Sequence, residues 1–434
     1  MAAVGLAGVS AIISFNGPLA IAASAAALLT VSGLVATETA ATAASSANTF
    51  TVTAPTQGGG AASPYKALVD AFNAKYPTYK AILVEEPTAT YDTAVVTKLR
   101  AGNASDVFKV QPGTGVAASV IDLAKAKYLA PISSTGVKKL IPAALRSVFE
   151  VNGKPYAVPL DQTVGAIVSN HTLMKADGVT WPTSFAGLLT ECKAARAKGK
   201  TFFGLAGGMF VNNGLAMMSV TGSSVYANGA TWNAKRVAGK TTFAASPEWN
   251  QDLSKFVQMS DAGCFQDGAA AGGFKDAIDD RFFGKKSYAI FVPGGTAVGF
   301  SNIPFFKDQT LKVQAFPGAK RLPVGVNYAL GVNAKTKKAA AVKKFINFAA
   351  TAGAQAAYQK VSGNLAVGAI DETKAPVQYS EVVGLVNAGK IYPFPNQAWN
   401  AEVYQKIGTG IQGLLNNQAA VYQVLRSADG AWKK

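Results

Sequence analysis

Hydrophobic and polar positions along the first quarter of the chain alternate between two periods. Short apolar runs predict three strands, at residues 49–54, 80–84 and 106–110. Between them, residues 65–76 and 91–101 carry apolar side chains three and four positions apart, which predicts two helices. Strands that alternate with helices in this way predict a parallel sheet covered by helices.

The carboxyl ends of these strands lead to the first candidate binding residues. Ligands of parallel sheets bind just beyond those ends. Gln57 follows the first strand and Gln111 follows the third. Both residues are therefore candidate ligand contacts, with ordinary loop residues as the alternative. The glycines after Gln57 form neither a P-loop nor a dinucleotide fingerprint.

A polar break interrupts the apolar pattern in the middle of the chain. A strand at residues 156–160 is followed by Asp161, Gln162 and Thr163, and then by an apolar run at 164–169. This pattern suggests a chain that passes from one packed unit to another beside a solvated gap. An ordinary strand-loop-strand connection is the alternative.

The second half of the chain repeats the strand and helix periods. Helices are predicted at 184–198, 249–262, 274–284, 339–351, 355–360, 403–415 and 419–428, and strands at 201–205, 287–291 and 325–333. The last of these strands contains Asn327 and could carry the chain back to the first unit.

Two loops of this half offer polar or aromatic candidates. The glycine-bounded loop 207–214 contains Phe210 and Asn212, a possible stacking platform with amides, or a core plug. The stretch 392–400 combines prolines and amides with Trp399. Rigid aromatic rings beside amides suit sugars, because rings cover the apolar face and amides bind hydroxyls. The alternative is that Trp399 caps the core.

Composition sets the number of units and the class of protein. A chain of 434 residues is too long for one core, so two lobes are expected. Only 15% of the residues are charged, and the net charge is +17, which permits attraction to an anionic wall, membrane surface or nucleic acid. No basic stripe is interleaved with aromatic residues, so we expect no nucleic-acid partner.

The N-terminal segment resembles a secretory signal. Residues 1–47 contain an apolar, small-residue run at 21–36 and small residues at 41–47, where cleavage would fall. The segment has no Lys or Arg, and a membrane anchor is the competing interpretation. Cys192 and Cys264 are the two cysteines, and an even number in an exported protein favours one disulfide over two buried thiols. Neither the spacing of the two cysteines nor the residues near them favour a metal site, and we expect no cofactor.

Catalytic signatures are weak. Asp279 and Asp280 are adjacent, so on a helix they diverge by about 100° and make a poor acid–base pair. His171 is the only histidine, and no GxSxG motif occurs. A secreted glycosidase therefore stays only as an alternative.

The order of these pieces resembles the extracellular solute-binding proteins of ABC importers, in particular the maltose-binding-like, family 1 group. The resemblance covers residues 49–432 and rests on an ordered series of segments: YKALVDAFNAKYPTYKAILVEE, KLRAGNASDVF, VNGKPYAVPLD, WPTSFAGLLTECKAARAKGK, FFGKKSYAIFVPGG, PVGVNYALGVNAKTKKAAAVKKFINFAA and YPFPNQAW. It implies an α/β fold with two lobes, each a mainly parallel sheet flanked by helices, joined by hinge crossings with the ligand in the cleft.

The same resemblance implies lobe boundaries. Lobe 1 would comprise residues 48–160 and 325–370, and lobe 2 residues 161–324 and 371–434, after a signal peptide at 1–47. Hinge residues would be Gln162, Thr163 and Val326. Cys192 and Cys264 would then share lobe 2, where a disulfide is possible.

The family's ligand contacts fall on strand-end loops and crossings. By position these are Gln57, Gln111, Asp161, Phe210, Asn212, Thr296, Asn327, Asn396 and Trp399. Two aromatic platforms of maltose-binding relatives are missing here, which favours a smaller or differently shaped sugar. The resemblance implies a non-enzymatic, monomeric carbohydrate receptor, exported to the periplasm or outer cell surface, that delivers its ligand to membrane permease subunits. A polyamine, peptide or phosphate ester is the alternative ligand.

Overall fold

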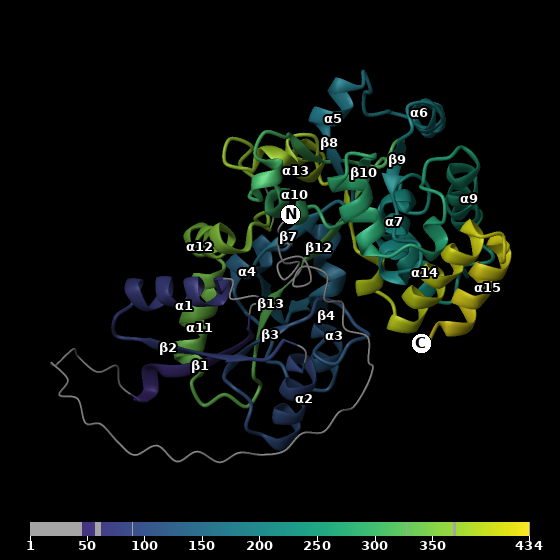
Figure 1. Ribbon diagram of the computed structural model, residues 1–434. Helices are drawn as coiled ribbons and strands as arrows, with labels where there is room; N and C mark the ends of the chain where they lie inside the picture. Colours follow the sequence, from purple (N-terminus) through teal and green to yellow (C-terminus); the bar gives the residue numbers. More distant parts are fainter. Residues whose placement is uncertain (1–45, 57–61, 89, 327, 368–369, 434) are drawn as a thin grey trace, which may run out of the picture.

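The computed structural model describes residues 46–56, 62–88, 90–326, 328–367 and 370–433. Gln57, Asn327 and nearly all of the predicted signal segment lie outside this part of the chain. Two bodies flank a central group of short strands (Figure 1). We call the body around the first sheet lobe 1 and the body around the second sheet lobe 2.

Lobe 1 is built on a five-stranded sheet in the order β2-β1-β3-β13-β6. Its strands are β1 (Thr49–Pro55), β2 (Lys80–Glu86), β3 (Val107–Val110), β6 (Ala157–Pro159) and β13 (Ala329–Val332). β1, β2 and β3 run parallel, whereas β13 is antiparallel to both β3 and β6. The carboxyl ends of β3 and β6 therefore lie at the same edge as the start of β13, because Ala329 pairs with Val110 and with Pro159.

Four helices of lobe 1 form where the predicted periodicity placed them: α1 (Pro64–Lys75), α2 (Tyr91–Ala101), α11 (Ala339–Ala349) and α12 (Ala352–Ser362). Two short helices, α3 (Val120–Lys125) and α4 (Thr135–Leu140), were not predicted. In α1 the Ser63 hydroxyl accepts the backbone N–H of Lys66 at 3.2 Å, and Pro64 occupies the first turn. Leu68 and Phe72 of this helix are buried on its inner face. The hairpin β4 (Glu150–Val151) and β5 (Lys154–Pro155) and a 3-10 turn at Ala143–Val148 complete the lobe.

Lobe 2 contains a four-stranded sheet in the order β11-β8-β10-β9. Its strands are β8 (Val168–Asn170), β9 (Thr201–Gly204), β10 (Ser287–Ile290) and β11 (Leu311–Val313). Only β9 and β10 are parallel, while β8 is antiparallel to its neighbours. Each sheet is thus mixed, with one strand, β13 in lobe 1 and β8 in lobe 2, that runs against the others. Each of these two strands is the first that the chain forms after it enters the lobe through a crossing.

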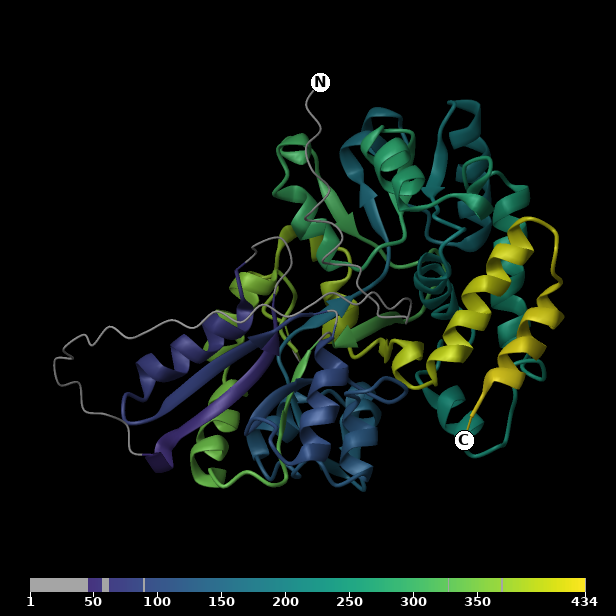
Figure 2. The same ribbon diagram turned by 60° about the horizontal axis from the view of Figure 1, so that its bottom comes forward.

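The helices of lobe 2 are α5 (His171–Ala176), α6 (Phe185–Ala197), α7 (Phe210–Thr221), α8 (Thr231–Val237), α9 (Pro247–Asp261), α10 (Gly295–Ser301), α13 (Val383–Asn387), α14 (Ala401–Leu415) and α15 (Val421–Ala431). The last two, drawn in yellow, lie on the side of lobe 2 remote from lobe 1 (Figure 2). The predicted helix at 274–284 is a π-helix, η6 (Lys275–Phe283). Short 3-10 turns lie at Ala269–Ala271, Pro304–Phe306, Val377–Tyr379 and Pro395–Gln397.

The crossings form a third sheet of three strands, β14-β12-β7. These are β7 (Gln162–Val164), β12 (Leu322–Val326) and β14 (Ile391–Pro393). β7 and β12 pair antiparallel, with Gln162 opposite Val326. The single strand predicted at 325–333 is therefore two strands, β12 in the crossing and β13 in lobe 1, just as the apolar run at 164–169 is split between β7 and β8.

The predicted disulfide is confirmed. Cys192 in α6 and Cys264, which follows α9, are bonded in lobe 2. The bond joins positions 72 residues apart. Among the described residues, no helix has both the length and the hydropathy that a membrane span requires.

Candidate functional site

The site lies where the carboxyl edges of both sheets face the three crossings. In lobe 1 this edge is set by the ends of β1, β3 and β6. In lobe 2 the ends of β9 and β10 lie together, and the first residue of β8 pairs with Ile290 at the end of β10. Ligands of α/β sheets bind at such carboxyl edges. We call the region between the two edges, where the ligand is predicted to bind, the cleft.

The third crossing follows α12 and contacts the first crossing. Leu365 forms an isolated bridge with Gln162, whose backbone N–H donates to the Leu365 carbonyl at 2.9 Å. One residue earlier, the Asn364 amide nitrogen donates to Asp161 at 2.9 Å, and its oxygen accepts the Thr163 hydroxyl at 3.1 Å. Asn364 thus ties the predicted polar break to the third crossing. No periodic pattern in the sequence marks this contact, because the partners are about 200 residues apart.

Asp161 is fully buried at this junction. Three tyrosines that interact with Asp161 have raised pKa values. Burial is the largest cause in each, and the negative charge of Asp161 raises each pKa further. The pKa of Tyr328 is raised to about 12 by burial and then by Asp161 and Asp92. The pKa values of Tyr358 and Tyr379 are raised by more than that of Tyr328, and burial is again the largest cause. These phenols therefore stay protonated hydrogen-bond donors at any physiological pH.

Lobe 1 contributes a charged group made of Asp92, Lys109, Gln111 and Tyr328. Asp92 lies in the first turn of α2, where the helix dipole favours a carboxylate. It accepts Lys109 Nζ at 3.0 Å and Gln111 Nε2 at 3.1 Å. Lys109 is only 3% exposed, and burial lowers its pKa although Asp92 opposes the shift. Its ammonium lies 5.3 Å from the centroid of the Tyr328 ring.

This charged group includes one predicted site residue and three that the sequence did not single out. Gln111 lies at the predicted strand end. Lys109 and Asp92 have signals that could have identified them: a lysine inside an apolar strand, and a carboxylate at the first turn of the following helix. A charged residue is rarely buried without a partner, so the pair could have been sought from the sequence.

Lobe 2 approaches the crossings through Gly294 and Gly295. A Cβ on Gly294 would lie 2.0 Å from the Val164 carbonyl, and one on Gly295 would lie 2.4 Å from the Asn364 amide oxygen. Only glycine allows the end of β10 to pack this closely on two crossings. The next residue, Thr296, is buried, and its hydroxyl has no hydrogen-bond partner within the described residues.

Other side chains at the crossings also hold unsatisfied polar atoms. Both amide atoms of Gln162, which is 0% exposed, lack a hydrogen-bond partner among the described residues, as do the Asn396 and Gln397 amide oxygens and the Tyr379 hydroxyl. Gln397 Nε2 donates to the carbonyl of Val326 at 3.0 Å, so its amide lies beside the strand partner of Gln162. Buried polar atoms normally pair, and an unpaired one costs free energy. Atoms of this kind are suited to a ligand with hydroxyl groups.

Two predicted ligand residues have a structural role instead. Trp399 is 1% exposed and packs against Trp232, Phe243 and Trp249, with its indole N–H donating to Asn233 at 3.2 Å. Asn212 is buried and bonds two backbone groups, Ala206 N–H at 2.9 Å and the Phe291 carbonyl at 2.6 Å. Neither side chain is available to a ligand in this structure, which corrects the expectation for both.

The structure departs less from the prediction for Phe210 than from those for Trp399 and Asn212. The predicted loop 207–214 is instead a short turn followed by the first turns of α7, which begins at Phe210. The half-buried Phe210 ring packs edge-on against Tyr404, 6.2 Å away between centroids. One face of lobe 2 is thus partly apolar next to the end of β9.

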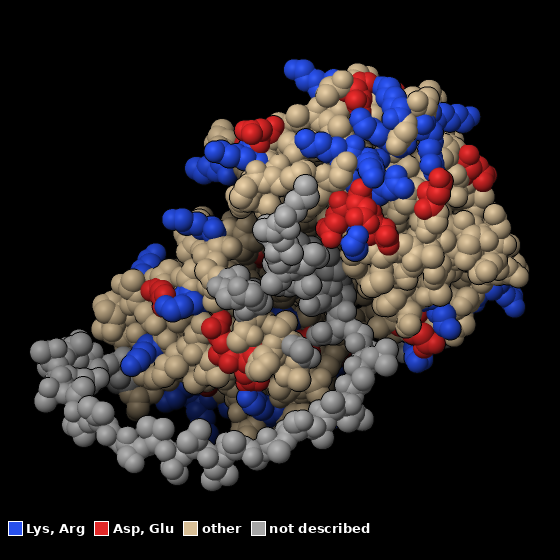
Figure 3. Space-filling view, viewed as in Figure 1, with Lys and Arg blue, Asp and Glu red and all other residues tan. Residues whose placement is uncertain are grey.

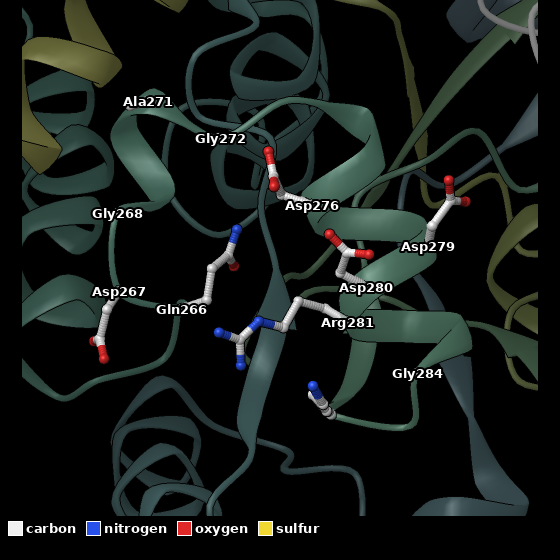
Figure 4. A pocket seen from close by; sticks show the side chains of 11 residues that line it. Gln266, Asp267, Gly268, Ala271, Gly272, Asp276, Asp279, Asp280, Arg281 and Gly284 are labelled. Atoms are coloured by element: carbon white, nitrogen blue, oxygen red, sulfur yellow. The ribbon is translucent and has the colours of Figure 1, made fainter.

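One hollow of the surface lies away from the crossings (Figure 4). It measures about 710 Å³ and lies between η6 and the segment 266–272, and no crossing residue lines it. Asp280 is paired with Lys275 at 2.9 Å, and Asp276 accepts the Gly273 N–H at 2.7 Å. Within the described residues, no group of three or more His, Cys, Asp or Glu side chains is placed to bind a metal ion.

The family model described as bacterial extracellular solute-binding protein matches residues 57–356. This chain belongs to that family. It is 28% identical over 351 residues to a multiple sugar-binding protein of Streptococcus mutans serotype c, covering 78% of this chain and 80% of the relative. The family match includes segments of both lobes.

Solved structures agree on the fold. A family 1 extracellular solute-binding protein from Bifidobacterium longum subsp. infantis superposes with a TM-score of 0.71 at 17% identity, covering 88% of this chain and 98% of that one. The solute-binding protein RafE in complex with raffinose gives a TM-score of 0.63 at 18% identity, covering 88% and 98%. The predicted two-lobe α/β solute-binding fold is therefore confirmed.

Proposed function

We propose that this solute-binding protein captures a neutral carbohydrate in the cleft and delivers it to the permease subunits of an ABC importer. The observation that carries the proposal is the set of buried, unsatisfied amide and hydroxyl groups at the crossings, led by Gln162. Groups that both donate and accept match sugar hydroxyls, which do the same. Relatives whose names include multiple sugars, raffinose and chitin oligosaccharide support this ligand class.

The charges at the cleft also favour a neutral ligand. Asp92 and Lys109 cancel each other across 3.0 Å, and Asp161 is held by Asn364. A polyamine would need several free carboxylates, and a phosphate ester would need free cations. Capture without turnover fits as well, since Asp279 and Asp280 lie on η6 rather than at the crossings. We therefore propose a receptor and not a glycosidase.

Closure would proceed about the three crossings. Lobe 1 would comprise residues 48–160 and 325–370, and lobe 2 residues 161–324 and 371–434, with Gln162, Thr163 and Val326 at the hinge. A sugar that bonds both carboxyl edges favours the closed state by its differential affinity. Export by the signal at 1–47, a location in the periplasm or on the outer surface, and a monomeric state complete the proposal.

A ligand screen by thermal shift tests the ligand class. The mature chain from Asn48 is heated with mono-, di- and oligosaccharides, amino acids, polyamines and phosphates. Ligand at a hundredfold excess over Kd stabilises the native state by about 2.7 kcal/mol. A saturable shift with one group of sugars supports the proposal, whereas shifts with polyamines or phosphates alone reject the sugar.

A substitution at the hinge tests the site. In Gln162→Met a side chain of similar volume replaces the unsatisfied amide, so the ligand-free protein should unfold at the same or a higher temperature. Affinity for the sugar should fall about tenfold or more, because its hydroxyls lose a partner. Gln258→Met, on the exposed side of α9, is the matched control and should leave both quantities unchanged. Unchanged affinity in Gln162→Met removes this residue from the site.

A further inference from the structure

Eight lysines gather at one end of lobe 1, and we call them the lysine surface. They are Lys127, Lys138, Lys139, Lys335, Lys337, Lys338, Lys343 and Lys344. All are exposed except Lys338, which is half-buried. The two segments that carry them, 123–149 and 309–370, contain no Asp or Glu at all.

The structure brings these two segments together. Leu129, two residues after Lys127, forms a bridge with Asn333, and the Ala334 N–H donates to the Tyr128 carbonyl at 2.9 Å. Helix α4, which holds Lys138 and Lys139, contacts α11, which holds Lys343 and Lys344. The positive charges thus form one surface although they come from sites about 200 residues apart.

These charges are not neutralised within the described part of the chain. None of the eight ammonium groups forms a salt bridge there, whereas Lys66, Lys98 and Lys109 of the same lobe each have a carboxylate partner. Lys338 instead donates to the Ser46 carbonyl, and Lys344 lies 4.4 Å from the centroid of the Tyr76 ring. The bordering carboxylate, Asp106, is already bonded to Thr336 at 2.6 Å and to Thr51. Unpaired like charges repel one another, and a bound anion would offset this repulsion.

A small cavity opens within the lysine surface. It measures about 250 Å³ and has an apolar floor that includes Ile132, Val342 and Ile346. Its rim includes Ser133, Thr336 and Lys343, which offer two hydroxyls and an ammonium. A chain of anionic groups linked by short carbon units would find both kinds of contact here.

The lysine surface faces away from the cleft. Val332, at the end of β13, pairs with Val107 at the start of β3, so the loop that follows lies at the amino edge of the sheet. The cleft lies at the opposite, carboxyl edge. In Figures 1 and 2, α11 and the loop before it occupy the end of lobe 1 remote from β7 and β12. Figure 3 shows that basic side chains also gather on lobe 2, at the top of that view, with acidic side chains beside and below them.

We propose that the lysine surface binds an extended polyanion, a phosphodiester polymer of the cell envelope. The polymer binds the end of lobe 1 that is remote from the cleft, so the sugar and the permease can still reach the cleft. An extended partner fits better than a single small anion, because the charges are spread over α4, a loop and α11. Such binding releases counterions and weakens as salt rises.

Immobilised long-chain inorganic polyphosphate serves as the probe for the mature full chain, at about 50 and 200 mM NaCl. The test variant carries Lys335→Gln, Lys337→Gln, Lys343→Gln and Lys344→Gln. The control variant carries Lys193→Gln, Lys235→Gln, Lys240→Gln and Lys390→Gln, four exposed lysines of lobe 2 without salt bridges within the described residues. Both variants have the same net charge.

We expect the test variant to lose at least about tenfold in affinity for polyphosphate and to show a weaker salt dependence, while the control stays within about twofold of wild type. Equal losses in both variants, or no binding by the wild type at the lower salt, overturn the proposal. Binding to vesicles of phosphatidylcholine and phosphatidylglycerol without binding to polyphosphate also overturns it. A second variant, Lys138→Gln with Lys139→Gln, repeats the test if the first fails to fold. Sugar binding should be unchanged throughout, so this proposal and the transport proposal can fail separately.

Discussion

The two lobes contribute different kinds of residue to the cleft. Lobe 1 presents a buried ion pair, Asp92 with Lys109, next to an amide and a phenol. Lobe 2 presents glycines and a threonine, and it places its tryptophans in an aromatic core that is further tied by the disulfide. We therefore expect polar recognition to be concentrated in lobe 1 and the crossings, with lobe 2 as a close-fitting cover.

The largest expected effect tests the structural role of lobe 2. Trp399→Ala should destabilise the protein by about 3–5 kcal/mol, because it leaves a cavity among Trp232, Phe243 and Trp249. Urea unfolding measures this loss. Phe210→Ala, which truncates a half-buried ring, should cost less. A Trp399→Ala protein that keeps its stability but loses sugar affinity would return the tryptophan to the binding site.

The disulfide offers a comparable test of the same lobe. Loss of the bond between Cys192 and Cys264, in the Cys192→Ala, Cys264→Ala double variant, should cost about 4 kcal/mol in the chain-entropy model. Unfolding should be followed with and without reductant, and the variant should show no response to it. Sugar affinity at a temperature where both proteins are folded should not change, since neither sulfur lies at the cleft. A large change in affinity would contradict the separation of roles.

A medium-sized effect is expected in lobe 1. Lys109→Met should lower sugar affinity by about tenfold to a hundredfold, because hydrogen bonds to charged groups contribute about 1.5–3 kcal/mol. Calorimetric titration of the sugar found in the screen measures it. Lys66→Met, which removes an exposed lysine of α1 from its pair with Asp70, is the control. Equal affinities in the two variants would place the ligand elsewhere.

The smallest effect concerns His171 at the start of α5 in lobe 2. Burial, and then the nearby Lys312, lowers its pKa below the ordinary 6.5, with Glu381 opposing; Gln314 contacts the ring. Between the two pKa values the unfolded chain holds more protons, so the free energy of unfolding rises with pH there and falls as the solution is acidified through 6.5. An NMR titration of this single histidine should give a midpoint below 6.5, and His171→Asn should lose that part of the pH dependence of stability. A midpoint at or above 6.5 would refute the lowered pKa of His171.

Much of the fold was predictable from local pattern. Period and capping placed α1, α2, β1, β2 and β3 within a few residues, because each depends on neighbours within one or two turns. The strand predicted at 325–333 failed for a different reason. Its apolar pattern is interrupted within the strand only by Asn327, and a single polar residue does not show that the chain leaves one sheet and enters another between Val326 and Ala329.

The candidate site was predictable to a lesser extent. Gln111, Asp161 and Thr296 lie at the carboxyl edges and crossings, where strand ends and the polar break placed them. Trp399 and Asn212 were misassigned, because an aromatic ring suits a sugar and a core equally well, and an amide can bond a ligand or the backbone. Asn364 and the unsatisfied state of Gln162 could not be read at all, since both depend on partners far away in the chain.

The sequence by itself determined the alternation of strands and helices, the polar break between the lobes, the pair of cysteines and two long segments without a single carboxylate. These follow from residue order and composition alone. Tertiary structure decided which polar groups are buried without partners, which aromatic rings fill the core and where the lysines gather. The physical reason is that burial and pairing depend on contacts between distant segments, and only the folded chain brings those segments together.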